Sequence, residues 1–197
     1  MGRKPNTDSR RQQIVAALLE EISVTGYERA STKSIAARAG LAPGLIHYHF
    51  KSKEEILLAL VDMLIELAEA GFAEAMKSAE SASEKLAAFV TSRVGLDPTF
   101  DSAAVKAWVS ILAEAMGQIG VRDRVAHWLG KDHTRLARLF KEAGSSQPKE
   151  QASLLLAMIL GSFTLHAINV SGVPKGYAER NIQDWLKNVD NSGIIQS

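Results

Sequence analysis

The stretch STKSIAARAGLAPGLIHYHFKSKEEIL, residues Ser31–Leu57, decides how the N-terminal part of this chain folds. It contains two short helical patterns separated by Gly40, and Pro43 opens the second of them. Glycine readily adopts the left-handed conformation that ends a helix, and proline suits a first helical turn, where its missing N–H would be unpaired anyway. The stretch therefore predicts two short helices joined by a tight turn, the pattern of a helix-turn-helix.

Small and apolar side chains indicate how these two helices pack. Ala36 and Ala39 would let the helices cross closely, while Ile46 and Phe50 would hold the second helix by its inner face. The N-terminal end of that helix would then point into a major groove of DNA. The residues left for its outer face are Pro43, Gly44, Leu45, His47 and Tyr48.

The composition limits what the protein can be. Its 197 residues include no cysteine, which excludes disulfides and thiolate metal sites and fits a reducing cytoplasm. No apolar run approaches the ~20 residues of a membrane span, and the N-terminus lacks the apolar core of a signal peptide. We expect a cytoplasmic protein without a membrane partner.

Charge is spread unevenly along the chain. The formal net charge is only +1, but residues 1–53 carry nine Lys and Arg against four Asp and Glu, and the remaining residues carry 14 against 18. A basic front on an acidic body suits a polyanion such as nucleic acid, although ordinary charge scatter would give the same totals.

Helical periodicity dominates the chain, and strand patterns are nearly missing. We predict an all-α fold of about nine helices. Residues 1–53 would form a three-helix DNA-binding module, and residues 54–197 a helical ligand-binding and dimerisation domain. The expected helices run from Asp8 or Ser9 to Gly26, from the Ser31/Thr32 cap to Gly40, from Pro43 to about Phe50, onward from Ser52, and over about 83–94, 102–119, 122–143, 149–171 and 177–189.

Three details of the later helices follow from local patterns. Ser52 and Glu55 have capping-box spacing, in which the Ser52 hydroxyl bonds the Glu55 N–H and the Glu55 carboxylate reaches back to the Ser52 N–H. The inward stripe expected in the fourth helix is Ile56, Leu60, Leu64, Leu67 and Gly71. The inward stripe expected over 102–119 is Val105, Trp108, Leu112, Met116 and Ile119.

The segment 149–171 is apolar on almost all faces, which in a soluble helix indicates burial on most sides. Polar residues interrupt it, so we favour burial in a subunit interface over a membrane span. Together with the Trp185 and Leu186 stripe of the last helix, it offers more apolar surface than one body can cover. We therefore expect Leu155 and Leu186 in the interface of a homodimer.

No metal or catalytic site can be assembled from the pattern. His47 and His49 point about 200° apart on a helix, so they cannot share an ion, and His127 and His133 also lie on different faces. No Ser-His-Asp or paired-carboxylate constellation stands out. We expect no metal, no cofactor and no enzymatic activity.

Residues 9–60 resemble the DNA-binding module of the TetR family of bacterial transcriptional regulators. APGLIHYHF in this module and WVSILAEAM (Trp108–Met116) in the body are similar to the choline-responsive repressor branch. The resemblance implies that Thr32 caps the second helix and contacts a phosphate, and that Lys53 holds another. The DNA contacts it implies are Thr32, Lys33, Pro43, Gly44, Leu45, His47, Tyr48, His49 and Lys53.

The implied contacts differ in kind. His47 stands where the family usually has a tyrosine, and its charge as a phosphate donor would vary with pH. Four residues of the outer face would lie against base edges and read bases through thymine methyls or DNA shape: Pro43, Gly44, Leu45 and Tyr48. The basic residues of Gly2–Lys4 and Arg10–Arg11 would either reach DNA or form a solubilising tail, and the sequence favours neither.

Two functions fit these features. The resemblance implies a ligand-responsive regulator, a homodimeric repressor released from a palindromic double-stranded operator by an unidentified small molecule. The alternative is an all-helical small-molecule-binding protein or enzyme with an incidental basic module. A ligand pocket should be apolar with a few polar groups, and Trp108 would offer a cation–π face to a cationic ligand. The pocket candidates are Trp108, Glu114, Met116, Phe163, His166 and Asn169.

Overall fold

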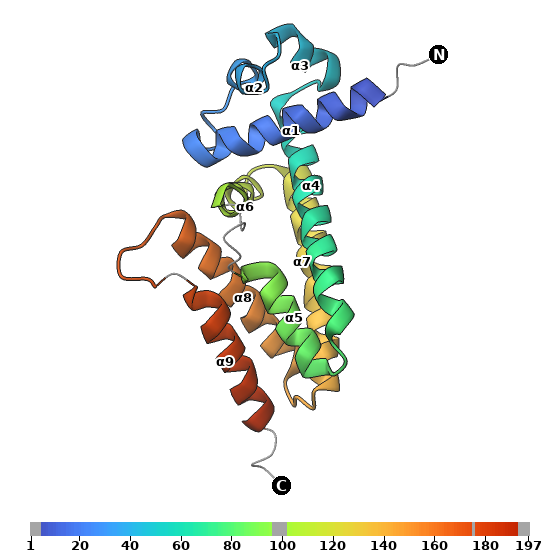
Figure 1. Cartoon of the computed structure of the whole chain (residues 1–197), viewed down its shortest axis with the longest axis vertical. Coiled ribbons are helices and arrows are strands. Elements are labelled where there is room, and N and C mark those ends of the chain that lie inside the picture. The colour runs from blue at the N-terminus through green and yellow to red at the C-terminus, as the bar shows by residue number, and fades with distance from the viewer. Residues whose placement is uncertain (1–4, 96–101, 175, 193–197) are drawn as a thin grey trace. The chain divides into compact units, whose positions relative to one another are not determined.

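The computed structural model describes residues 5–95, 102–174 and 176–192 (Figure 1). Within these residues the chain forms nine α-helices, one short 3-10 helix and no strand, which confirms the predicted all-α fold. The elements are α1 (Pro5–Thr25), α2 (Thr32–Arg38), α3 (Pro43–His49), α4 (Lys53–Ala75), η1 (Met76–Ser78), α5 (Ala82–Val94), α6 (Ser102–Glu114), α7 (Ile119–Glu142), α8 (Pro148–Ala167) and α9 (Tyr177–Ser192).

The turn between α2 and α3 forms as its sequence predicts, but the cap of α2 differs. Gly40 has a φ of +65°, and Pro43 is the first residue of α3. Ser31, not Thr32, is the N-cap of α2: its hydroxyl accepts from the Ser34 N–H at 3.0 Å, and the Ser34 hydroxyl accepts from the Ser31 N–H at 3.0 Å. Ser34 takes the place of the usual Glu or Gln of a capping box, so the usual sequence pattern does not predict this one.

The starts of α1 and α4 also depart from expectation. Helix α1 begins at Pro5 rather than Asp8, in keeping with the tolerance of a first helical turn for proline. At α4 the Glu55 N–H donates to the Ser52 hydroxyl at 3.1 Å, as predicted. The Glu55 carboxylate, however, accepts from the Lys51 N–H at 2.7 Å instead of from Ser52, so the predicted box forms only in part.

The described residues fall into two compact units. The first lies within Met1–Leu64 and Asp101–Val125, and the second within Ile65–Phe100 and Ala126–Ser197. Helices α4 and α7 therefore contribute to both units, and α6 packs against α1 inside the first. A functional boundary after residue 53 stays a prediction.

The core of the first unit fixes the helix-turn-helix on α1 (Figure 1). Ile14 and Leu18 of α1 are fully buried, and so are Ile35 of α2 and Ile46 of α3. Phe50, just after α3, is 1% exposed. Truncating such a residue typically costs ~2–5 kcal/mol, so these contacts hold α3 firmly by its inner face.

The inward stripe predicted for α4 is correct only in its first half. Leu64 is 4% exposed, but Leu67 is 61% exposed and Gly71 is exposed as well. Within α4 the first unit ends at Leu64, and the remainder of the helix buries a different face, which includes Phe72, in the second unit. A single helical period cannot predict such a change of face.

The helix predicted over 102–119 is in fact two elements. Helix α6 ends at Glu114, a turn follows, and Ile119 begins α7. Met116 and Ile119 were expected to face inward, but they are 82% and 66% exposed. The turn breaks the helical period on which that prediction depended.

The second unit comprises the end of α4 with η1, α5, most of α7, α8 and α9. Leu155 and Leu186, expected in a homodimer interface, are 0% and 5% exposed within the single chain, so that prediction is wrong for these two residues. The unit's own core buries them. Within the single chain, Leu154, Leu165 and Ile168 at the outer face or end of α8 are exposed, and burial of that face in a subunit interface stays a prediction.

Candidate functional site

The outer face of α3 presents large side chains to solvent. Tyr48 is 79% exposed and Leu45 43%, while Ile46 between them is fully buried. The other residues predicted to touch bases or phosphates from this face, Pro43, Gly44 and His47, are exposed too. A two-turn helix held by one buried residue and Phe50 thus offers an apolar and aromatic surface without arginine or lysine.

The C-terminal end of α3 is tied to α1 by Arg11. Its guanidinium donates to the His49 carbonyl oxygen, lies 3.9 Å from the centre of the Phe50 ring and pairs with Glu55 at 3.6 Å. A cation at a helix C-terminus is favourable because the carbonyl ends carry partial negative charge. Arg11 is therefore part of the module's structure, and Arg10 bonds Gln13 at 2.6 Å. Residues Gly2–Lys4, for which the sequence left DNA contact or a tail open, lie outside the described residues.

His49, predicted to lie near the DNA backbone, is only half exposed. Its Nδ1 atom is buried and has no hydrogen-bond partner among the described residues. Its ring meets the Tyr48 ring edge-on, with 5.0 Å between centroids. His49 thus supports the exposed Tyr48 ring from the side, and its own phosphate contact stays a prediction.

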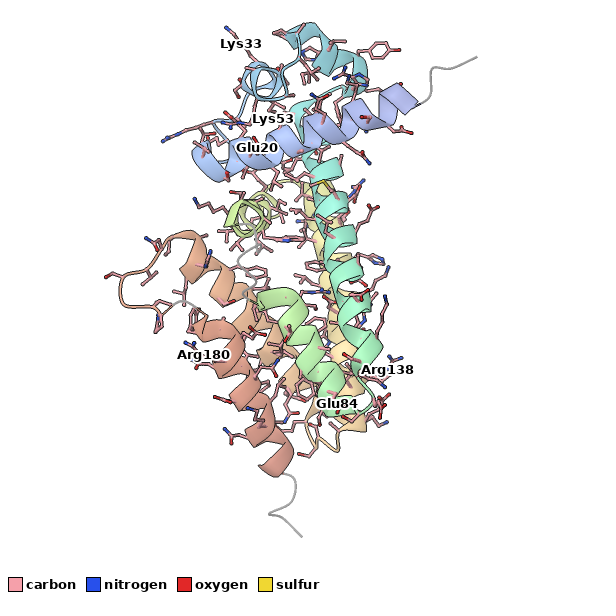
Figure 2. The ribbon with its side chains drawn as sticks, viewed as in Figure 1. Glu20, Lys33, Lys53, Glu84, Arg138 and Arg180 are labelled. Carbon is pink, nitrogen blue, oxygen red and sulfur yellow. The ribbon has the colours of Figure 1, made fainter. Side chains whose placement is uncertain are left out.

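The two lysines predicted to touch DNA differ in their surroundings (Figure 2). Lys33 on α2 is exposed and free to reach a phosphate. Lys53 donates from Nζ to the carbonyl oxygens of Tyr27, Glu28 and Ala30 at 3.0, 3.3 and 2.9 Å, and it lies 4.2 Å from the centre of the Tyr27 ring. An ammonium group has three N–H donors, and here the loop between α1 and α2 takes all of them.

A polar cluster joins this loop to the turn after α6. Tyr27 is buried, and burial is the main reason that its pKa rises to about 12. The Gln118 side chain opposes this rise in the pKa of Tyr27, and its Nε2 donates to Glu114 at 2.6 Å. The carboxylate of Glu114, which was predicted to bind a ligand, thus accepts a hydrogen bond from Gln118 within the first unit.

The residues predicted to bind a ligand are divided between the two units. Trp108 is buried and Glu114 partly buried in the first unit, whereas Phe163 is buried in the second. His166 and Asn169 are exposed on the second unit, and Asn169 has a φ of +50°, an unusual value for a residue other than glycine. Their roles in ligand binding stay predictions.

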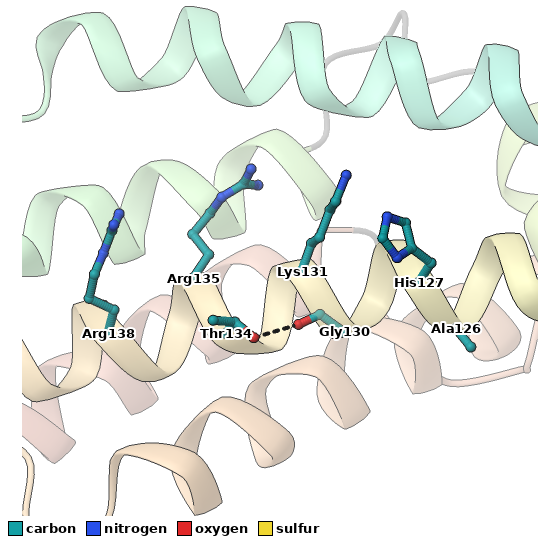
Figure 3. Close-up of a pocket in the computed structure, with 7 residues that line it drawn as sticks. All are labelled: Ala126, His127, Gly130, Lys131, Thr134, Arg135 and Arg138. Carbon is teal, nitrogen blue, oxygen red and sulfur yellow. Dashed lines mark hydrogen bonds between the residues drawn. The ribbon is translucent and has the colours of Figure 1, made fainter.

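Two grooves open on the second unit. One, of about 570 Å³, is mostly apolar and lies between α8 and α9, where Met158, Leu165 and Ile182 line it. The other, of about 680 Å³, runs along one face of α7 (Figure 3). The described residues that line the α7 groove are Ala126, His127, Gly130, Lys131, Thr134, Arg135 and Arg138.

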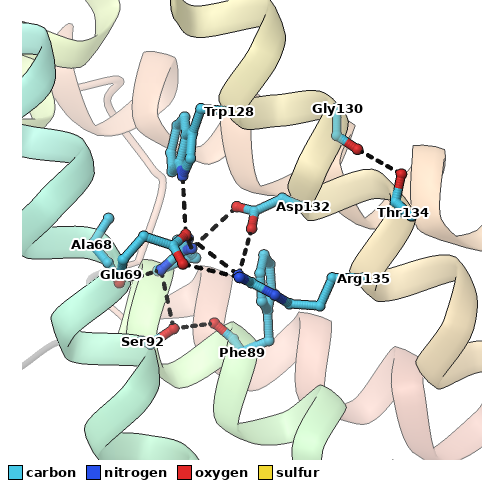
Figure 4. A network of polar contacts seen from close by, with 10 residues as sticks. Ala68, Glu69, Phe89, Ser92, Trp128, Gly130, Asp132, Thr134 and Arg135 are labelled. Carbon is cyan, nitrogen blue, oxygen red and sulfur yellow. Dashed lines mark hydrogen bonds and ion pairs between the residues drawn. The ribbon is translucent and has the colours of Figure 1, made fainter.

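A buried charge network lies beside this groove and was not predicted (Figure 4). Arg93 of α5 and Asp132 of α7 are 4% and 1% exposed, and they pair at 3.1 Å. Arg135 bonds Asp132 at 2.8 Å and Glu69 of α4 at 2.9 Å. Trp128 Nε1 donates to Glu69 at 3.2 Å, so carboxylates and guanidinium groups alternate across three helices.

Aromatic rings surround the buried guanidinium. Arg93 lies 4.7 Å from the centre of the Phe89 ring, 5.4 Å from that of Trp128 and 5.9 Å from that of Phe72. Rings with carboxylates behind them form the kind of site that binds organic cations, and here the chain's own arginine occupies it. A charged residue at a core-facing position of α5, four residues after Phe89, was the signal that could have revealed it.

The network also affects proton binding by Glu69. Burial raises the pKa of its carboxyl, but the hydrogen bond and positive charge of Arg135 oppose this and, with Trp128 and Arg93, leave the pKa below its ordinary value. Glu69 is therefore ionised at neutral pH. Its charge links the C-terminal half of α4 to α7.

Two family models match the chain. Residues 14–60 match the bacterial regulatory proteins of the tetR family, and residues 82–190 match the C-terminal region of the BetI-type transcriptional repressors. The HTH-type transcriptional regulator BetI of Cronobacter sakazakii is 33% identical over 84% of this chain and 82% of its own length. BetI of Klebsiella pneumoniae is 31% identical over 90% and 92%.

Solved structures share the fold. A transcriptional regulator from Rhodococcus sp. Rha1 superposes with a TM-score of 0.83 at 21% identity, covering 92% of this chain and 96% of its own. A regulator from Saccharomonospora viridis, solved in complex with choline, has a TM-score of 0.78 at 21% identity, covering 92% and 95%. No helix in the described part of the chain is long and apolar enough to span a membrane.

Proposed function

Because this chain belongs to the TetR family of bacterial regulatory proteins, in its BetI-type repressor branch, we propose how its parts do the work of a repressor. The chain is a DNA-binding transcriptional regulator that responds to a ligand. The observation that carries the DNA-binding role is the exposed outer face of α3, with Tyr48 and Leu45 projecting from a helix whose inner face is locked. Such a helix fits a major groove, and its apolar tip suits thymine methyl groups.

In this proposal, the residues that read the base sequence differ from those that contact the phosphate backbone of DNA. Tyr48 and Leu45, with Pro43 and Gly44 at the start of the helix, would meet base edges. Lys33, Thr32 and His47 would contact phosphates, which position the protein without reading sequence. Lys53 would act mainly by shaping the loop that leads into α2, because its donors are already engaged.

A homodimer is part of the proposal, because α3 alone reads too few base pairs and a two-fold partner supplies a second half-site. The exposed side of α8 supports α8 and α9 as the interface. Leu154, Leu165 and Ile168 are 48%, 37% and 65% exposed there, and the apolar groove between α8 and α9 adjoins Leu165. The matching operator would be palindromic.

We further propose a small organic cation as the effector and choline as the first compound to test. The regulator of Saccharomonospora viridis was solved with choline, and a quaternary ammonium group prefers an aromatic face. Trp108 stays the predicted face for it. The ligand would favour a conformation that binds the operator less well, so the repressor would leave DNA. The site of action would be the cytoplasm, and no catalysis is needed.

The test uses full-length protein and DNA fragments upstream of its own gene in a gel-shift titration. Binding that survives competition by random DNA, and that weakens when choline is added, is the expected result. A Tyr48→Ala variant should lose the specific shift and keep weak, salt-sensitive binding. If wild type and Tyr48→Ala retard all fragments equally, the proposed reading of bases by α3 is contradicted. If choline leaves the shift of wild type unchanged, only the proposal that choline is the effector is contradicted.

A further inference from the structure

Four of the seven described residues that line the α7 groove are basic (Figure 3). His127, Lys131, Arg135 and Arg138 recur at spacings that place them along one face of the helix. None of the described residues that line the groove is acidic. In a chain whose net charge is only +1, this is a strong local concentration of positive charge.

Carboxylates in the described part of the chain neutralise Arg135 and, on the surface, Arg138, but not the other basic residues of the groove. Among the described residues, His127 and Lys131 have no carboxylate within ion-pair distance. Arg138 pairs with Glu142 at 3.6 Å, but both side chains are largely exposed, and such a surface pair contributes little. Exposed like charges of this kind favour an anion that can reach several of them at once.

Arg135 differs from its neighbours because it faces both the groove and the buried network. Its side chain is 26% exposed. Nη1 donates to Asp132 at 2.8 Å and to Glu69 at 3.3 Å, and Nη2 donates to Glu69 at 2.9 Å. Of its five N–H groups, the one on Nε and one on Nη2 have no partner among the described residues.

These two N–H groups lie on the same edge of the guanidinium. A pair of parallel N–H groups is the arrangement that binds a carboxylate or a phosphate through two hydrogen bonds. Lys131 and Arg138 stand about one turn before and after Arg135 on α7, where they can neutralise further charge on the same ligand. We propose that the α7 groove is a binding site for a small organic anion bearing a carboxylate or phosphate group.

The groove belongs to the second unit, whereas Trp108, the face proposed above for a cation, belongs to the first. Within the groove, the Glu69 carboxylate competes with an anion for Arg135. Glu69 holds the end edge of the Arg135 guanidinium, so an anion that draws this guanidinium outward weakens the link between α4 and α7. The coupling is reciprocal: the factor by which the anion weakens the Glu69–Arg135 pair equals the factor by which that pair weakens anion binding. An anion in the groove would thus act on α4.

The experiment is calorimetric titration of full-length protein with inorganic phosphate and with citrate, at constant ionic strength maintained with chloride. Wild type should bind at least one of the two. The Lys131→Ala, Arg138→Ala double variant should bind about tenfold more weakly, since charge-assisted hydrogen bonds are lost. Lys141→Ala is the matched control, because Lys141 is exposed on α7 and is not among the residues that line the groove, and it should leave binding unchanged.

A second pair of variants tests the competition. Glu69→Gln should bind the anion several-fold more tightly than wild type, whereas Glu66→Gln, which makes the same change of charge at an exposed position of α4, should not. The lysine and arginine variants alter only partly or fully exposed side chains, so they decide the outcome even if Glu69→Gln unfolds. The proposal is overturned if neither anion binds, if Lys141→Ala weakens binding as much as the double variant, or if the double variant affects only DNA binding.

Discussion

Lys53 is the residue for which family resemblance and geometry give opposite expectations. The resemblance implies a phosphate contact, so Lys53→Ala would weaken binding to all DNA and lower the slope of log affinity against log salt by about one unit. The structure instead uses its three N–H donors on the carbonyl oxygens of Tyr27, Glu28 and Ala30. We predict that Lys53 mainly stabilises the first unit.

The size of the effect follows from these contacts. One hydrogen bond from a charged donor contributes ~1.5–3 kcal/mol, and a cation–π contact with Tyr27 adds ~0.5–1 kcal/mol. The other carbonyl oxygens regain water once the ammonium is gone, so they add little. Lys53→Ala should therefore lower the free energy of unfolding by ~2–4 kcal/mol.

The assay combines urea unfolding with DNA titration at several salt concentrations. Lys33→Ala is the matched control, because Lys33 is exposed on α2. It should lower the salt slope by about one unit and leave stability unchanged, whereas Lys53→Ala should do the reverse. If Lys53→Ala lowers the slope and leaves stability intact, the reasoning from its hydrogen bonds is refuted.

Other predictions concern base reading, assembly and pH. Tyr48→Ala should cost ~1–3 kcal/mol on the operator and much less on random DNA, by fluorescence anisotropy; equal losses would remove Tyr48 from the specificity set. Leu154→Asp with Ile168→Asp should give folded monomers by light scattering, since both side chains are exposed in the single chain, and a persistent dimer would place the interface elsewhere. The pKa of Tyr27 is raised because the fold favours the neutral phenol over the phenolate. The free energy of unfolding of wild type should therefore fall as pH rises from about 10 to about 12, and that of Tyr27→Phe should not show this fall. The lowered pKa of Glu69 has the opposite effect, because its ionised form stabilises the fold. This stabilisation is fully present above the ordinary pKa of a glutamate and disappears as pH falls through the pKa of Glu69 in the folded state. The difference in unfolding free energy between wild type and Glu69→Gln should therefore become smaller in acid.

The helix-turn-helix could be predicted because its determinants are local. Gly40 permits the left-handed conformation that ends α2, and the ring of Pro43 fixes a helical φ at the start of α3. The burial of Ile46 and the exposure of Tyr48 follow from the helical period. The exposures of Met116 and Leu67 could not be predicted in the same way. Met116 lies in the turn that follows α6, and Leu67 lies where α4 passes from one unit to the other.

Contacts between distant residues account for the remaining differences. Arg93 and Asp132 are 39 positions apart, and nothing near either residue in sequence indicates that they meet. Leu155 was predicted to face a second copy because α8 is apolar, but periodicity cannot tell which apolar face the chain's own helices cover. Leu154, its neighbour, is the exposed one.

The most direct measurement for the central claim is selection of DNA from a random pool by the full-length protein, followed by sequencing. If the protein is a homodimer that reads bases with α3, we expect one palindromic sequence to be enriched. This duplex should bind two protomers and hold them at least ~10³-fold more tightly than random DNA at physiological salt. A pool that shows no enriched sequence after repeated rounds, with wild type and Tyr48→Ala binding it equally, would contradict the account.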